Sequence, residues 1–175
     1  MNIKEALLQD EVHLKKQAVG IASYACESAV NFKELMQCFL ANDYRLAQRA
    51  AWSVSWAVRK KPELIQPYVK DLVAQLQRKD VHKAVIRNSV RILEMIDVAE
   101  PFHGEIMNAC FSFIETPATP VAIKAFALSM LFKLSENYPD IRHELKLIIE
   151  ERMRTETAAF KSRGRKILEQ LSSGE

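Results

Sequence analysis

Apolar residues recur three or four positions apart along most of the chain, which is the spacing of one face of an α-helix. Residues 43–60 show the pattern clearly, because one side of a helix there is apolar and the opposite side carries charged and aromatic residues. The apolar side consists of Ala47, Ala51, Val54 and Val58. Strict alternation of apolar and polar residues, which would indicate a strand, is not sustained anywhere. The sequence therefore predicts an all-α protein.

The pattern divides the chain into a series of helices joined by short polar turns. The predicted helices cover residues 2–9, 11–28, 31–41, 43–60, 62–78, 80–97, 101–115, 119–136, 138–154 and 156–172. Matching basic residues recur in every second helix at intervals of 37 or 38 residues, and they are Arg49, Arg87, Lys124 and Lys161. Such a constant phase indicates an internal repeat of two helices.

Residues that favour the starts of helices follow the same period. Pro62, Pro101 and Pro139 begin the first helix of successive repeats, where the missing N–H of proline costs nothing. Asp43 and Asp80 stand where a second helix begins, so their carboxylates are expected to accept the free backbone N–H groups there.

The stretch PELIQPYVKDLVAQLQRKDVHKAVIRNSVRIL resembles a HEAT repeat, with a proline-led first helix, an aspartate after the turn and the aliphatic-Arg pair Ile86-Arg87. Asp43 and Arg49 keep the spacing of six that is typical of that family. The resemblance covers residues 26–172 and implies a right-handed α-solenoid of about four helical hairpins. We expect residues 1–25 to form an N-terminal helical cap, and residues 1–175 to form a single domain.

Composition adds few constraints on function. The 25 basic and 22 acidic residues leave a net charge of +3, which permits binding to polyanions without requiring it. Cys26, Cys38 and Cys110 lie in apolar sequence and are expected in the core rather than in disulfides. The charged N-terminus lacks the apolar region of a signal peptide, and the apolar runs are about half a membrane span. We therefore expect a soluble, cytoplasmic, monomeric protein with no membrane association.

The polar side of residues 43–60 is a candidate binding face. Arg45, Arg49, Trp52 and Trp56 fall together there, and Trp and Arg are enriched at binding hot spots. The alternative is structural, because Trp52 and Trp56 could fill the gap against the N-terminal cap.

The next repeat extends this candidate face. Lys83, Arg87 and Arg91 project from one side of their helix, and Glu94 shares that side. Second helices line the concave surface in HEAT-like arrays, so the resemblance implies a basic row that continues through Lys124 to the cluster at residues 161–166. The alternatives are a solvated face and, for Arg49 and Arg87, hydrogen bonding between repeats.

Motifs for catalysis or metal binding are absent from the sequence. It has no Gly-rich phosphate loop, no Cys-x-x-Cys and no His-Glu-x-x-His, and its single Glu-x-x-His, Glu100 to His103, is half of what a di-iron bundle needs. No cofactor or metal site is predicted. We expect a non-enzymatic scaffold that binds a protein or peptide on its concave face.

The alternative function is nucleic-acid binding. The chain is similar to the alkylpurine DNA glycosylases that are built from HEAT-like repeats, which bind DNA on a basic concave face with Trp and a carboxylate at the lesion. That resemblance implies DNA contacts from the Arg and Trp residues between 45 and 56, with Asp43 or Glu94 as the carboxylate.

Overall fold

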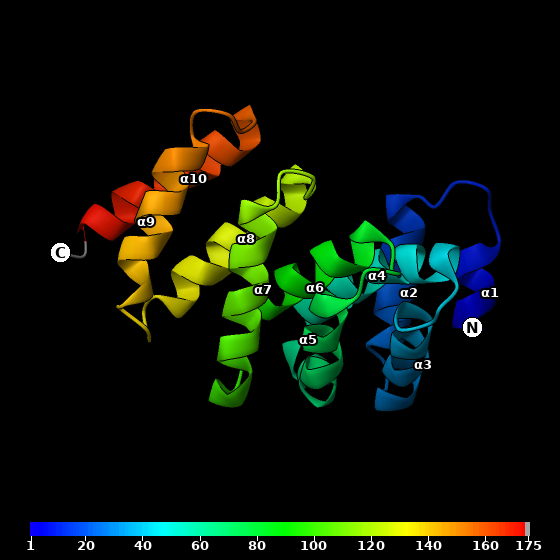
Figure 1. The fold of residues 1–175 in the computed structure, drawn as a ribbon. Helices are drawn as coiled ribbons and strands as arrows, with labels where there is room; N and C mark the ends of the chain where they lie inside the picture. Colours follow the sequence, from blue (N-terminus) through cyan, green and yellow to red (C-terminus); the bar gives the residue numbers. More distant parts are fainter. Residues whose placement is uncertain (174–175) are drawn as a thin grey trace. The chain divides into compact units, whose positions relative to one another are not determined.

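The computed structural model describes residues 1–173, and every regular element in that range is a helix. The α-helices are α1 (Ile3–Leu8), α2 (Lys15–Ala25), α3 (Ala29–Phe39), α4 (Tyr44–Lys60), α5 (Val69–Gln77), α6 (Lys83–Met95), α7 (His103–Glu115), α8 (Val121–Leu134), α9 (Ile141–Arg152) and α10 (Ala158–Ser173). Two 3₁₀-helices, η1 (Pro62–Tyr68) and η2 (Glu100–Phe102), precede α5 and α7 (Figure 1). The predicted all-α fold is confirmed.

The helices gather into two compact units. Unit 1 is Met1–Ile96, and unit 2 begins at Asp97. In unit 1 consecutive helices pack as the pairs α1–α2, α3–α4 and α5–α6, and the second helices α2, α4 and α6 lie side by side (Figure 1). In unit 2 the pairs are α7–α8 and α9–α10, and α8 packs on α10. Each unit therefore stacks its second helices, as the sequence period predicts.

The starts of the second helices α4 and α6 are fixed by local side-chain hydrogen bonds. The Asp43 carboxylate accepts the backbone N–H of Leu46 at 2.8 Å, which confirms the predicted cap of α4. The corresponding prediction for Asp80 is wrong. Its carboxylate binds Arg78 instead, and α6 begins after His82, whose Nδ1 accepts the N–H of Ala84 at 2.9 Å.

Two predicted helices are shorter than the apolar pattern suggested. Residues 62–78 do not form one α-helix, because Pro67 has no N–H for the helical ladder; the segment is the 3₁₀-helix η1 followed by α5. Likewise, α2 does not begin at residue 11. The Gln17 side chain accepts the N–H of Leu14 at 2.7 Å and sets the start of α2 at Lys15. Residues 9–14 are consequently a loop.

The core of each unit is apolar and contains the cysteines. Cys26, Cys38 and Cys110 are buried and unpaired, as predicted. Burial raises the pKa of the Cys38 thiol to about 11, and the nearby Glu34 adds to the effect. These thiols are core side chains rather than reactive groups.

Close packing of the last two helices depends on Gly164. A Cβ at this position of α10 would lie 2.9 Å from Cγ2 of Ile149 in α9, a fully buried side chain. We predict that Gly164→Ala destabilises the protein by about 1 kcal/mol, because overpacking outweighs the helix propensity gained. Gly20 in α2 has no atom within 4 Å of such a Cβ, so Gly20→Ala should stabilise by about 0.5–1 kcal/mol. The two variants should shift the midpoint temperature of thermal unfolding in opposite directions. Equal shifts would contradict the close packing at Gly164.

Candidate functional site

A pocket of about 620 Å³ lies within unit 1, between the loop that follows α1 and the helices α4 and α6. Five of the seven predicted binding residues line it: Arg45, Arg49, Trp52, Arg87 and Arg91. The other lining residues come from the loop, from α4 and from α6, and they are Glu11, Val12, His13, Gln48, Ala84 and Asn88. Lys83 and Trp56 are not part of its lining. We call this hollow the basic pocket.

Arg49 is a buried residue of the pocket lining and is held by backbone carbonyls. Its Nη1 donates to the carbonyl oxygens of Leu7 and Asp10, each at 2.7 Å, and its Nη2 donates to that of Glu11 at 2.6 Å. The side chain is only 7% exposed. A cation at the end of α1 also interacts favourably with the helix dipole. Arg49 thus has the structural role that the sequence left open as the alternative, and it links the first helix pair to the second.

Burial and a like charge both act on this guanidinium. Burial lowers the pKa of Arg49, and Arg45 lowers it further, while Asp10 opposes the change. Arg49 stays protonated at neutral pH, because an arginine side chain is not deprotonated in proteins. The basic pocket therefore holds adjacent positive charges whose repulsion an anion would relieve.

Arg45 lies one helical turn before Arg49 and is much less constrained. It is exposed, and its Nη2 donates to the carbonyls of Asp10 and Glu11 at 3.2 and 3.3 Å, longer than the bonds of Arg49. Water can replace bonds of this kind at small cost. Arg45 can therefore turn toward a ligand.

On α6, Arg87 presents its charge to solvent at the basic pocket. Arg87 is exposed, and no hydrogen bond or ion pair holds it within residues 1–173. Arg91 lies one turn further along α6 and is half-buried. The buried Asn88 lies between them and donates to the carbonyl of Ala84 at 2.8 Å. Lys83 is exposed, but it lies on α6 outside the pocket.

The indole of Trp52 forms an aromatic wall of the basic pocket. It is half-buried, and the ring of His13 packs edge-on against it with 6.1 Å between the ring centroids. Burial lowers the pKa of His13, Arg49 adds to this, and Asp10 opposes it, so the imidazole is mainly neutral at pH 7. Its Nε2 is buried and has no hydrogen-bond partner among the described residues.

Trp56 lies next to a different set of groups. The ammonium of Lys15 and the guanidinium of Arg59 lie over its ring, 5.2 and 5.0 Å from the centroid. Trp56 therefore packs α4 against α2 through cation–π contacts. This position agrees with the alternative prediction, in which the tryptophans fill the gap against the N-terminal cap.

The expected basic row is interrupted in unit 2, where Lys124 lies in the core. Lys124 is 2% exposed and forms an ion pair with Glu156, which follows α9. The prediction that Lys124 continues a basic surface is therefore wrong. The charge is buried because a carboxylate from the next helix pair neutralises it. In the cluster at residues 161–166, Arg163 donates to Oγ of Ser129 at 2.8 Å, and Arg165 and Lys166 are exposed.

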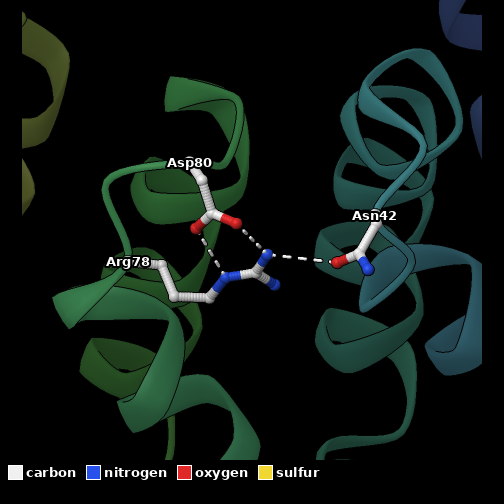
Figure 2. Close-up of polar contacts among 3 residues, drawn as sticks. All are labelled: Asn42, Arg78 and Asp80. Carbon is white, nitrogen blue, oxygen red and sulfur yellow. Dashed lines mark hydrogen bonds and ion pairs between the residues drawn. The ribbon is translucent and has the colours of Figure 1, made fainter.

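Neighbouring repeats of unit 1 are also linked through their turns. Arg78 donates through Nε and Nη2 to the two carboxylate oxygens of Asp80 at 3.0 and 2.7 Å. The same Nη2 reaches Oδ1 of Asn42 at 3.2 Å, in the turn between α3 and α4 (Figure 2). Both the aspartate and the asparagine are exposed, so this cluster orients the turns without offering a buried site.

Charge is distributed unevenly between the two units. Residues 1–96 contain 15 Lys and Arg residues against 10 Asp and Glu residues, whereas residues 97–175 contain 10 against 12. The small net charge of the whole chain hides this difference. Unit 1, which contains the basic pocket, therefore carries the positive excess.

His103, the histidine of the Glu-x-x-His motif, is held by hydrogen bonds within the fold. His103 is 9% exposed; it lies 3.0 Å from the Tyr138 hydroxyl through Nδ1 and 2.8 Å from the Val98 carbonyl through Nε2. Hydrogen bonds to these two neutral groups account for the buried position of His103, and no metal ion is needed to explain it. Within residues 1–173, no group of three potential metal ligands comes together, and no helix is long and apolar enough to cross a membrane.

Sequence reasoning missed the loop residues Glu11, Val12 and His13, which form one rim of the basic pocket. The apolar pattern predicts that these residues belong to a helix over residues 11–28. In such a helix their backbone carbonyls would bond within the helix and would not face α4. The one signal available was Val12, which with Leu14 is one of two apolar residues in the charged stretch QDEVHLKK. Its side chain is 66% exposed in the structure.

The comparison with protein families gives one finding. A family model described as HEAT repeat domain matches residues 4–171, which is nearly the whole chain and includes α1 and α2. Neither a curated protein nor a solved structure matches the chain.

Proposed function

Because the chain belongs to the HEAT repeat family, we propose that it is a non-enzymatic cytoplasmic scaffold that binds a protein or peptide partner through one face of unit 1. The binding residues on this face are Arg45, Trp52, Arg87 and Arg91. The observation that carries the proposal is the basic pocket, where exposed guanidinium groups from two repeats stand beside a half-buried indole. Arg49 supports this face from beneath and is not assigned to the partner contact.

The interaction is expected to depend on exposed charge rather than on the stability of the fold. Reversing Arg45 and Arg87 together, as Arg45→Glu/Arg87→Glu, should abolish partner retention, because both side chains are exposed and face the pocket. The matched control is Lys33→Glu, a charge reversal at an exposed position of α3. Affinity capture with quantitative mass spectrometry should give a set of proteins that the wild type and Lys33→Glu retain and the double variant loses.

Thermal unfolding of each variant checks that the fold is unchanged. If all three proteins retained the same partners, this face would not be the binding site. The nucleic-acid alternative makes a different prediction, namely retention on duplex DNA that falls steeply with salt. Strong salt-dependent DNA binding that requires Arg87 would replace the scaffold proposal.

A further inference from the structure

We infer that the partner segment at the basic pocket is an acidic peptide stretch that also carries an apolar side chain. This inference rests on the proposed function and names the chemistry of the partner at the same face. It assigns Arg45 and Arg87 to carboxylates, and it assigns Val12 and Trp52 to the apolar side chain.

The lining of the basic pocket is predominantly positive. Four arginines and a single acidic residue, Glu11, line it, and His13 adds little charge at pH 7 because its pKa is lowered. The two exposed arginines come from adjacent repeats, so they can bind carboxylates at two points along an extended segment. Arginine binds a carboxylate through two parallel N–H groups, which gives direction as well as attraction.

Part of the pocket rim is apolar. Val12 is 66% exposed and lines the pocket, and Leu14, two residues later in the same loop, is 59% exposed. The indole of Trp52 is half-buried at the same pocket. Isolated exposed apolar residues are common, but here Val12 lines the same pocket as an indole and a cluster of arginines. An apolar side chain of the partner would bury Val12 and cover the indole.

The lining of the basic pocket suits an acidic peptide better than a phosphate backbone. A nucleic-acid strand needs a continuous basic track and stacking surfaces. Within unit 1, Glu11 interrupts the positive lining, and the ring of Trp56 is already covered by Lys15 and Arg59. The pocket volume of about 620 Å³ suits a few side chains, because ligand pockets typically measure about 300–1,000 Å³. The observations favour separate carboxylates around an apolar anchor.

The test is a selection from a displayed library of random twelve-residue peptides on the immobilised full-length chain. The selected peptides are expected to be enriched in Asp and Glu around one apolar residue. Synthetic copies should bind the wild type and Lys33→Glu equally, and should bind Arg45→Glu/Arg87→Glu at least about tenfold more weakly. Replacing Glu by Gln in a selected peptide should weaken binding to the wild type by a similar factor. A separate variant, Val12→Ser, should weaken the binding of peptides that contain the apolar residue. It should not change the binding of peptides that lack it.

Each other outcome has a defined meaning. Peptides that require Arg45 and Arg87 but lack carboxylates, or that bind equally after Glu is replaced by Gln, overturn this inference and leave the scaffold proposal in place. Peptides that bind the double variant as well as the wild type overturn both. Binding of a 20-base-pair DNA duplex in preference to every selected peptide also overturns both.

Discussion

Glu156→Ala is expected to lower the free energy of unfolding by about 3–5 kcal/mol, the largest effect of any single substitution considered for this protein. The reason is that Lys124 is 2% exposed and Glu156 is its ion-pair partner. With alanine at 156, the ammonium group remains buried without an opposite charge. Chemical denaturation followed by circular dichroism measures the loss, and hydrogen exchange should locate it in α8 and α10.

The control replaces both members of the pair. Lys124→Met/Glu156→Leu removes both charges and keeps apolar volume at the site, so it should be close to the wild type or more stable. A loss below about 1 kcal/mol for Glu156→Ala would mean that water reaches Lys124, and the buried pair would then not be a structural element of unit 2.

Arg49→Ala should lower the free energy of unfolding by about 3 kcal/mol, because one buried cation supplies three hydrogen bonds to backbone carbonyls. The carbonyl of Leu7 is the most costly to leave unpaired, since its bond lies in buried surroundings. Arg49→Lys should recover only part of this stability, because an ammonium group cannot reproduce the geometry of the guanidinium. Hydrogen exchange should show the loss first in α1.

The matched control for Arg49 lies one turn earlier on the same helix. Arg45→Ala removes an exposed guanidinium with longer bonds to two of the same carbonyls, so it should cost less than about 0.5 kcal/mol. Similar losses at both positions would show that general electrostatic attraction to the loop, rather than the buried hydrogen bonds, holds the first helix pair in place.

The helical pairs could be predicted from the sequence because their signals are local. Apolar spacing, the prolines at helix starts and the cap at Asp43 act within a few residues, and the structure has helices where they predict them. The exceptions are local too: the start of α6 depended on His82 rather than Asp80, Pro67 divided a predicted helix, and Gln17 set the start of α2 at Lys15 rather than at residue 11.

The role of each repeated basic residue could not be predicted, because it depends on partners far away in the sequence. Arg49 meets a carbonyl 42 residues earlier, and Lys124 meets a carboxylate 32 residues later. Arg87 occupies the matching place in α6 but lies exposed at the basic pocket. One sequence position therefore has a different environment in each repeat, and only the packed structure distinguishes them.

We propose that Arg49 holds unit 1 together, whereas Arg87 is available to bind a partner. The most direct test compares the chemical denaturation of Arg49→Ala and Arg87→Ala with that of the wild type, under one set of conditions. We expect a loss of about 3 kcal/mol for Arg49→Ala and a change within about 0.5 kcal/mol for Arg87→Ala. Equal losses at the two positions would contradict it, because Arg87 would then be a structural residue like Arg49.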